Sequence, residues 1–230
     1  MSEITWAGLM CGRFALIVDA SVLADVFHVD PPHELSPRFN IAPTQDIPVV
    51  RTGRDQTREC VLLRWGLIPA WAKDQSIGAR MINARGETVA DKPSFRAAVK
   101  SRRCLIPASG FFEWARVGDR KQPHYIHFED DRVFAFAGLW ERWTRGGDPI
   151  ESCTIITTSP NDLVAPLHDR MPVILPSERH EEWLAPEALD PARLAGLLAP
   201  HPAQGMEAFP VSRHVNRPAN DDPRCIEPVA

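Results

Sequence analysis

The chain has 230 residues, of which 44% are apolar and 24% charged, and its formal net charge is −4. These values are typical of a globular protein and exclude a chain that is disordered throughout, collagen-like or a long coiled coil. The 22 prolines predict many turns and short elements, and the negative charge balance argues against a nucleic-acid binder whose whole surface is basic.

Short strands and a few helices are predicted along the chain. Runs of apolar and aromatic residues bounded by Pro, Gly or Asp predict strands at residues 47–51, 60–67, 103–107, 124–128, 133–140, 153–158 and 172–175. Helical patterns cover residues 21–27, 94–100, 177–183 and 191–198. Because helices and strands do not alternate regularly, we predict an α+β fold. It is a single domain of mostly antiparallel strands that form a curved or barrel-like sheet, with a few peripheral helices.

Positive charge is concentrated between residues 80 and 103. This window contains seven Lys or Arg and two acidic residues, so its net charge is +5 in a chain that is negative overall. Such a run indicates either a local basic patch that binds nucleic acid or only a solvated face.

Targeting and cysteine patterns narrow the class further. No apolar run approaches the roughly 20 residues that cross a bilayer, and residues 1–10 lack the features of a secretory signal. We therefore expect a cytoplasmic protein with no membrane partner. The five scattered cysteines have no metal-ligand spacing, which predicts neither a disulfide framework nor a structural metal. Three of them lie in apolar runs and are expected to be small buried residues: Cys60, Cys104 and Cys153.

The first candidate for chemistry is Cys11, in the run MCGRF. If translation starts at Met10, or if residues 1–10 are removed, Cys11 carries an α-amine of pKa about 8 beside a thiol of pKa about 8.5. Such an aminothiol can close a five-membered thiazolidine on an aldehyde, because the thiol adds intramolecularly to the imine that the amine forms. The alternative is an ordinary buried cysteine near the start of a strand.

Three further segments contain candidate acid, base or phosphate-binding groups. Asn83 and Arg85 would share one face of an extended segment, unless Asn83 only stabilises a turn. Glu113 lies in an aromatic run, where burial would raise its pKa and suit it to proton transfer; the alternative is an exposed position on the outer face of a strand. His168 and Arg170, in a Pro-bounded loop, could be a general acid or base and a phosphate contact.

Two segments suggest contact with single-stranded nucleic acid. RFNIAP at 38–43 and WGLIPAW at 65–71 combine polar groups with rigid apolar side chains, which can stack on or separate bases while Arg follows the backbone. Core packing is the alternative, above all for Trp65. The sequence contains no P-loop, GxGxxG, GxSxG or HExxH motif.

Together and in this order, these segments resemble the SOS-response-associated peptidase (SRAP) family, the abasic-site-shielding proteins. The resemblance rests on seven motifs that span nearly the whole chain: MCGRF at 10–14, RFNIAPT at 38–44, WGLIPAW at 65–71, INARGET at 82–88, SGFFEW at 109–114, LHDRMPVIL at 167–175 and PVSRHVN at 210–216.

The resemblance implies a protein that recognises abasic sites in single-stranded DNA and forms a thiazolidine cross-link through an N-terminal cysteine, here Cys11, protecting the lesion in the DNA-damage (SOS) response. It places the orienting amide on Asn83, the proton-transfer carboxylate on Glu113 and the catalytic histidine on His168. The implied DNA contacts are Arg13, Asn40, Pro43, Trp71, Arg85 and Arg170. The expected partner is single-stranded DNA containing abasic sites, bound by a monomer that is nucleoid-associated when on DNA. No metal or other cofactor is implied, and weak lyase and self-processing activities are secondary expectations.

This sequence departs from the family pattern at its start, where ten residues precede Cys11. We expect residues 1–10 to be an extension that is not translated or is removed, and residues 11–230 to be the catalytic domain. If the extension persists, the amine is an amide and no thiazolidine forms. Ala72 is a second departure, since many relatives have Trp there. The alternative functions are a cysteine peptidase acting on protein substrates and a non-catalytic single-strand binding module.

Overall fold

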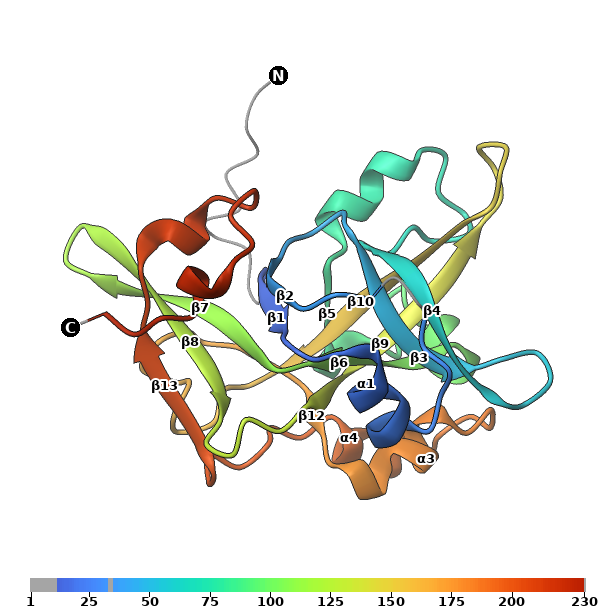
Figure 1. Cartoon of the computed structure of the whole chain (residues 1–230). Coiled ribbons are helices and arrows are strands. Elements are labelled where there is room, and N and C mark those ends of the chain that lie inside the picture. The colour runs from blue at the N-terminus through green and yellow to red at the C-terminus, as the bar shows by residue number, and fades with distance from the viewer. Residues whose placement is uncertain (1–11, 33–34, 230) are drawn as a thin grey trace.

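The computed structural model describes residues 12–32 and 35–229 (Figure 1). Five strands close into a barrel, because each pairs with the next and the last pairs with the first. In order around the barrel they are β3 (Asp46–Thr52), β4 (Arg58–Trp65), β10 (Ile150–Thr158), β9 (Phe134–Trp143) and β6 (Arg103–Ala108). All pairs are antiparallel except β4–β10, which is parallel and short. Closure leaves few free strand edges.

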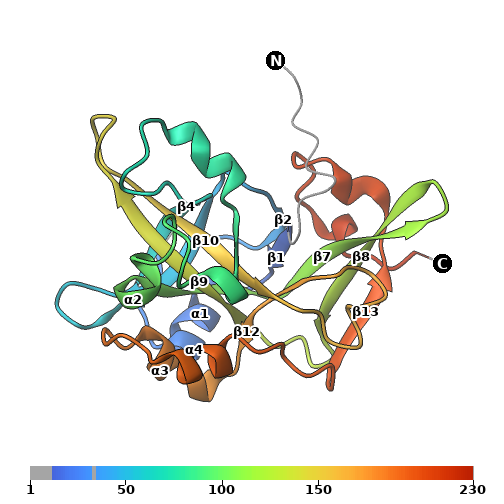
Figure 2. The ribbon, with the colours of Figure 1, turned by 180° about the vertical axis from the view of Figure 1, so that it is seen from behind.

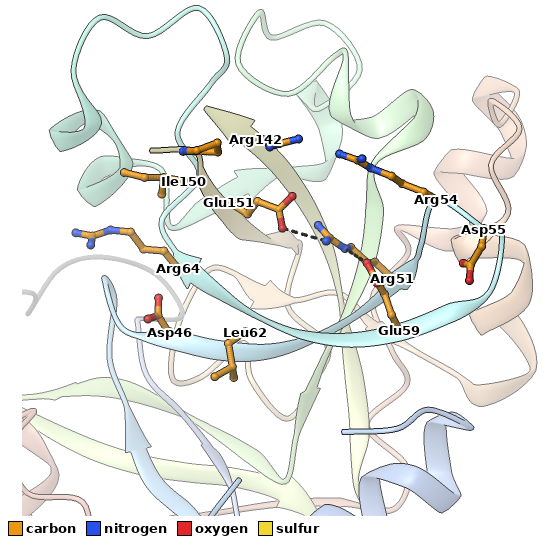
Figure 3. Close-up of a pocket in the computed structure, with 11 residues that line it drawn as sticks. Asp46, Arg51, Arg54, Asp55, Glu59, Leu62, Arg64, Arg142, Ile150 and Glu151 are labelled. Atoms are coloured by element: carbon orange, nitrogen blue, oxygen red, sulfur yellow. Dashed lines mark hydrogen bonds and ion pairs between the residues drawn. The ribbon is translucent and has the colours of Figure 1, made fainter. Parts of the chain in front are cut away.

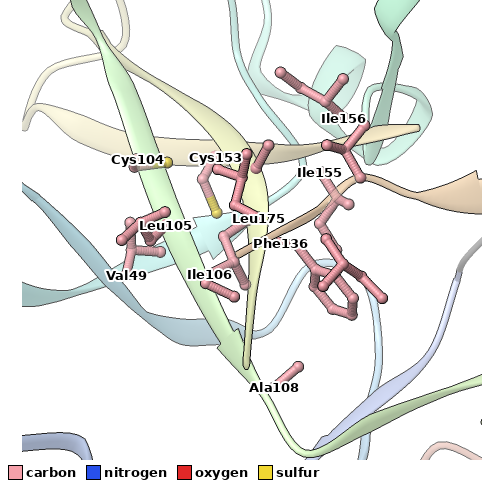
Figure 4. Close-up of a cluster of buried hydrophobic side chains, with 14 of the residues drawn as sticks. Val49, Cys104, Leu105, Ile106, Ala108, Phe136, Cys153, Ile155, Ile156 and Leu175 are labelled. Carbon is pink, nitrogen blue, oxygen red and sulfur yellow. The ribbon is translucent and has the colours of Figure 1, made fainter. Parts of the chain in front are cut away.

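The barrel interior is filled by side chains (Figure 4). Cys104 and Ile106 of β6 face Gly138 of β9, where a Cβ would lie 3.0 Å from Cys104 Sγ and 2.8 Å from Ile106 Cδ1. Glycine is therefore the residue that lets β9 pass these two side chains at normal contact distance. Cys104 and Cys153 are 0% exposed and Cys60 is 8% exposed, which confirms their prediction as small buried residues.

A second, fully antiparallel sheet packs beside the barrel. Its strands are, in order, β13 (Met206–Pro210), β8 (Arg120–Phe128), β7 (Gly110–Val117), β1 (Phe14–Leu16) and β2 (Arg38–Ile41). Figure 1 shows β7, β8 and β13 on the left, the barrel on the right and β1 between them. Three short strands extend the barrel sheet: β5 (Asn83–Arg85), β11 (Met171–Pro172) and β12 (Ile174–Leu175).

The helices are short and peripheral (Figure 2). The α-helices are α1 (Ala20–Phe27), α2 (Ala98–Ser101), α3 (His180–Leu184) and α4 (Pro191–Leu197). The 3₁₀ helices are η1 (Gln75–Arg80), η2 (Gly86–Thr88), η3 (Ser177–Arg179), η4 (Arg213–Asn216) and η5 (Pro223–Cys225). Asp190 caps α4 by accepting a hydrogen bond from the Arg193 N–H. None of the helices in the described residues is both long and apolar enough to span a membrane.

The predicted fold class is confirmed: one domain, mostly antiparallel strands, a barrel and few helices. Every predicted strand region contains a strand, and residues 144–149 form the hairpin connection between β9 and β10. The helix predicted at 94–100 is wrong at its start, because residues 94–97 form turns and α2 spans only four residues. Hydrogen bonds of helical spacing run from the Arg96 N–H to the Lys92 oxygen and from the Val99 N–H to the Phe95 oxygen, but the backbone between them forms turns and no continuous helix.

Gly66 allows two backbone segments to approach closely beside the barrel. Its φ is 129°, and a Cβ there would lie 2.6 Å from the Gly78 carbonyl oxygen. We expect Gly66→Ala to lower the free energy of unfolding by about 2–3 kcal/mol, from backbone strain and the forced separation of these segments, as measured by urea denaturation. Gly196→Ala is the control: the added methyl meets nothing in α4, and the free energy of unfolding should rise by about 0.5–1 kcal/mol. Equal effects of the two substitutions would contradict this account.

Candidate active site

The N-terminal strand leads toward Glu113. β1 pairs antiparallel with β7, and the Phe112 N–H donates to the Arg13 carbonyl oxygen at 3.1 Å. Because the strands are antiparallel, the chain before Arg13 runs along β7 toward Glu113, the residue after Phe112, and its next residue is the buried Gly12. Cys11 is the next residue and lies outside the described residues, as does the predicted extension 1–10, so its role stays a prediction.

Glu113 is a buried carboxylate within β7. It is 2% exposed, lies between Phe112 and Trp114 in the chain, and is opposite His124 in β8. The alternative of an exposed glutamate on the outer face is therefore excluded. A buried position is what the predicted proton-transfer role of Glu113 requires, and the role itself stays a prediction.

Asn83 and Arg85 lie on β5, at the edge of the barrel sheet. β5 pairs in parallel with β10, with Asn83 opposite Ile155 and Arg85 opposite Thr157. Asn83 is half-buried and Arg85 is exposed. The segment is thus a short strand rather than the alternative turn. Its neighbour in the chain, Ile82, accepts a hydrogen bond from Trp65 Nε1 at 2.9 Å, which anchors β5 to the core.

His168 lies in the loop between β10 and β11, with 24% of its side chain exposed. Its Nδ1 accepts a hydrogen bond from the Arg170 N–H at 3.1 Å, which places the proton of the neutral ring on Nε2. Asp169 Oδ1 is 3.0 Å from the same Nδ1, a contact that requires a proton there. The two contacts therefore require different positions of the ring proton, and the 86% exposed Asp169 is the more weakly held partner because water screens it.

The Arg170 side chain is bound to Glu87 rather than open to solvent. Its Nη1 pairs with Glu87 Oε1, its Nη2 donates to Glu87 Oε2 at 2.8 Å, and Nη2 also donates to the Thr157 carbonyl oxygen at 2.7 Å. The hydrogen bond from Arg170 holds the pKa of Glu87 below its usual value. In the sequence, Glu87 is only one of the two acidic residues in the basic window at 80–103, and nothing but its place in the INARGET motif marks it as part of the site.

Arg13 and Asn40 are buried and bonded to each other. Arg13 Nη1 donates to Asn40 Oδ1 at 2.8 Å and to the Val215 carbonyl oxygen at 2.7 Å. Asn40 Nδ2 contacts three carbonyl oxygens of the C-terminal segment, those of Val215, Arg217 and Asn220. Desolvation lowers the pKa of Arg13 to about 10. In this conformation both side chains hold the C-terminal segment against β1 and β2, and their predicted DNA contacts stay predictions.

The aromatic and proline candidates differ in exposure. Trp71 is 49% exposed, and its Nε1 donates to the Pro93 carbonyl oxygen at 3.4 Å, so one part of the ring is held while the rest faces solvent. Trp65 is 0% exposed and belongs to the core, as its alternative interpretation predicts. Pro43 is also buried, so its predicted wedging of a DNA strand stays a prediction.

Two of the seven cations between residues 80 and 103 are used inside the protein. Arg103 is buried and donates to five carbonyl groups around α2 and α3, and Arg102 pairs with Glu141 at 2.8 Å. The other five are exposed: Arg80, Arg85, Lys92, Arg96 and Lys100. The local basic surface therefore contains fewer cations than the sequence window does.

A hollow of about 960 Å³ lies beside the part of β4 that does not pair with β10 (Figure 3). It is lined by four arginines and four acidic residues: Arg51, Arg54, Arg64, Arg142, Asp46, Asp55, Glu59 and Glu151. Arg51 at its centre is bound by Glu59 at 2.7 Å and Glu151 at 3.0 Å. Its charges balance, and none of the predicted site residues lines it.

One cluster in the C-terminal segment has the donor types of a metal site. His214, Asp222 and Cys225 have ligand atoms within 4.8 Å of one another. His214 Nε2 is already 3.0 Å from Asp222 Oδ2, and Arg224 donates to both carboxylate oxygens. Because a guanidinium covers the carboxylate, these residues fit an internal hydrogen-bond network better than a cation site.

The fold and the site together define a single-domain barrel protein whose N-terminal strand runs beside a buried carboxylate. A family model described as SOS response associated peptidase (SRAP) matches residues 10–218. The chain therefore belongs to the SRAP family, and the resemblance seen in the sequence is confirmed.

Known relatives cover most of the chain. "Abasic site processing protein YoqW" of Bacillus subtilis (strain 168) is 48% identical over 95% of this chain and 99% of its own length. "Abasic site processing protein YedK" of Escherichia coli (strain K12) is 31% identical over 96% of this chain and 100% of its own length. "Abasic site processing protein HMCES" of Gallus gallus is 33% identical over 84% of this chain and 66% of its own length. A crystal structure of a Bacteroides thetaiotaomicron protein, 29% identical, superposes with a TM-score of 0.86 over 96% of this chain and 100% of that one.

The cysteines among the described residues should be unreactive. Burial raises the pKa of the Cys60 thiol to about 11 and those of Cys104, Cys153 and Cys225 above the usual value, so little thiolate exists at pH 8. We expect brief iodoacetamide treatment of the folded protein to leave these four unlabelled, as read by peptide mass spectrometry. A guanidinium-unfolded sample is the control, in which all four should react. Fast labelling of Cys60 or Cys225 in the folded protein would contradict the described burial.

Proposed function

We propose that this protein recognises abasic sites in single-stranded DNA and joins itself covalently to them through a thiazolidine on Cys11. The observation that carries the proposal is the antiparallel pairing of β1 with β7, which directs the chain before Phe14 toward the buried Glu113. The relatives named abasic site processing proteins support the same substrate.

The chemistry needs an amine, a thiol and proton transfer. The α-amine of Cys11 adds to the aldehyde of the open sugar, and one water leaves as the imine forms. The thiol then adds to the imine carbon and its proton passes to the nitrogen, closing the ring. In this proposal the imidazolium form of His168 donates a proton to the ring oxygen of the closed sugar, and Glu113 accepts the proton that the anomeric hydroxyl loses as the ring opens. Glu113 also moves the protons of imine formation, and Asn83 orients the sugar or amine. The reaction requires no metal or other cofactor.

DNA binding in this proposal uses the exposed candidates directly. Arg85 contacts a phosphate and Trp71 stacks beside the lesion, since both side chains are exposed. Arg13 and Asn40 act indirectly in this proposal, because their hydrogen bonds hold the C-terminal segment against β1 and β2. We further propose that residues 1–10 are absent from or cleaved off the active form, that it works as a cytoplasmic monomer, nucleoid-associated when on DNA, and that weak β-elimination competes with ring closure.

A denaturing gel tests the reaction. Protein beginning at Cys11 is incubated with single-stranded DNA that contains one abasic site, and we expect a heat-resistant shifted band. Cys11→Ala should abolish the band, and Glu113→Gln should slow its formation by about 10²-fold, the typical contribution of one acid–base group. The matched DNA control contains a tetrahydrofuran analogue, which has no aldehyde and should bind without cross-linking.

Other outcomes would replace this function. Reversible, salt-sensitive binding that is unchanged in Cys11→Ala would favour a single-strand binding module. Turnover of peptide substrates without DNA would favour a peptidase that acts on other proteins. A chain that retains Met1 and still cross-links fully would exclude the thiazolidine, because the nitrogen of Cys11 is then part of a peptide bond.

Trp71 provides a separate test of strand binding. We expect Trp71→Ala to weaken noncovalent binding to tetrahydrofuran-containing DNA by about 1–3 kcal/mol, the usual value of one base–aromatic stack, while Trp71→Phe retains most of the affinity. Fluorescence anisotropy measures both. Val117→Ala is the control, since Val117 is similarly exposed but lies at the tip of the β7–β8 hairpin. Unchanged affinity in Trp71→Ala would remove stacking from the proposal.

A further inference from the structure

We propose that Trp143 is a positioning residue for Trp71, because it holds the turn that carries the Trp71 ring. This inference rests on the proposed function, in which Trp71 stacks beside the lesion. Trp143 is the last residue of β9, and Trp71 lies in the segment between β4 and β5. The two residues are connected through a backbone carbonyl group next to Trp71.

Residues 69–72 form a tight turn with Trp71 at its corner. The Ala72 N–H donates to the Pro69 carbonyl oxygen at 2.8 Å, a bond that joins the first and fourth residues of a β-turn. Pro69 and Ala72 are buried, whereas Ala70 and Trp71 are exposed. The turn therefore presents Trp71 to solvent while its two ends lie inside the protein.

The hairpin of β9 and β10 binds this turn on both sides. Before the turn, the Ile68 N–H donates to Ser152 Oγ of β10 at 2.8 Å, and Ser152 is 0% exposed. After the turn, Trp143 Nε1 donates to the Ala72 carbonyl oxygen at 2.8 Å. Both bonds are buried, so a group that loses its partner there is left without a hydrogen bond. The two bonds therefore fix the turn to the hairpin.

The Trp143 ring is itself held in place. It is 4% exposed and packs with Ile68 and Ala72 in a small apolar cluster apart from the main core. A Cβ on Gly146 would lie 2.2 Å from Cη2 of the ring, so glycine lets the loop between β9 and β10 close over the indole. This packing restrains the direction in which the indole N–H points.

Trp71 depends on this support because its own side chain is weakly held. Its Nε1 donates to the Pro93 carbonyl oxygen at 3.4 Å, a long hydrogen bond, and the residue is 49% exposed. The direction of such a ring is set mainly by its backbone. A ring that is in position before DNA arrives avoids the entropy cost of ordering it on binding. Trp143 thus contributes to affinity although it is buried and cannot stack on a base.

The competing interpretation makes Trp143 only a filler of the small apolar cluster. The two interpretations predict different results when Trp143 and Trp71 are changed together. A filler lowers stability when it is truncated, and its effect on DNA binding is small and independent of Trp71. A positioning residue loses its effect on binding once Trp71 is gone.

A double-mutant cycle distinguishes them. Affinities for tetrahydrofuran-containing single-stranded DNA are measured by fluorescence anisotropy, well below the melting temperature of every variant. We expect Trp143→Phe, which keeps an aromatic ring but removes the indole N–H, to weaken binding about 5-fold, the low end of what one base–aromatic stack contributes. In Trp71→Ala protein the same substitution should change affinity less than about 1.5-fold. Additive effects, or unchanged affinity in Trp143→Phe, would overturn the inference.

Trp183 offers a matched control. It is 0% exposed, and its Nε1 donates to the Cys104 carbonyl oxygen at 2.8 Å, so Trp183→Phe also removes a buried indole N–H from a backbone oxygen. It should lower the melting temperature and leave DNA affinity unchanged; weaker binding to the extent seen in Trp143→Phe would contradict a specific role of Trp143. Gly146→Ala keeps the Trp143 indole but displaces it, and should weaken binding as Trp143→Phe does, which keeps the test decisive if Trp143→Phe does not fold.

A measurement without DNA separates this inference from the proposed function. Hydrogen exchange followed by NMR should show the Ala72 N–H exchanging about 10-fold faster in Trp143→Phe and Gly146→Ala than in the wild-type protein, and at the wild-type rate in Trp183→Phe. If Trp71→Ala binds DNA like the wild type but exchange is faster in this way, the proposed stacking fails and the support of the turn by Trp143 stands. If Trp71→Ala weakens binding and exchange in Trp143→Phe matches the wild type, only the positioning role fails.

Discussion

The contact between Phe14 and the barrel is the interaction on which the site geometry depends. Phe14 packs edge-on against Trp65 of β4 and Phe136 of β9, with ring centroids 5.3 Å and 5.8 Å apart, while its backbone pairs with β7. One side chain thus joins the two sheets. Truncating a buried Phe costs about 3–5 kcal/mol, and here the loss would also release the strand that leads toward Glu113. Because Trp65 in turn binds the Ile82 carbonyl oxygen, the same contact fixes β5 relative to β1.

Hydrogen bonds of Arg13 and Asn40 also hold β1 in place, in addition to the packing of Phe14. Arg13 precedes Phe14 and ties β1 to β2 and to the C-terminal segment through Asn40 and Val215. Burying a guanidinium costs free energy that its hydrogen bonds offset, and the bonds from Nη1 and Nη2 of Arg13 reach residues about 200 positions away. The C-terminal segment therefore does not merely cover the surface, because it supplies the carbonyl oxygens that make the burial of Arg13 possible. Stability at this end of the molecule and the position of the N-terminal strand are properties of one network.

These long-range bonds also explain which features the sequence could predict. The long barrel strands contain runs of β-branched and aromatic residues, so these strands could be predicted from the sequence. β1, β2 and β5 have three or four residues each, too few for a period to emerge, and tertiary pairing alone makes them strands. The residue types at positions 83, 113 and 168 point to acid–base and orienting groups, and the carboxylate at 113 is the most informative because it lies in an aromatic run. The burial of Asn40 and the partner of Arg170 could not be read, since each depends on segments far away in the chain.

The fate of the arginines shows why charge counting is a weak guide to a binding surface. Arg13, Arg103 and Arg170 all lie in segments that a sequence reader would assign to DNA, yet each is neutralised or satisfied inside the protein. What remains at the surface near β5 is a smaller set that includes Arg85 and Lys92, next to the exposed ring of Trp71, which is tied to the backbone of Pro93. A few free cations beside one stacking platform suit a single strand whose bases are unstacked, since such a strand is held by rings as much as by charge. The exposed Arg85, Lys92 and Trp71 are therefore the side chains that the proposed DNA binding uses directly, while Arg13, Arg103 and Arg170 bond to other segments of the protein.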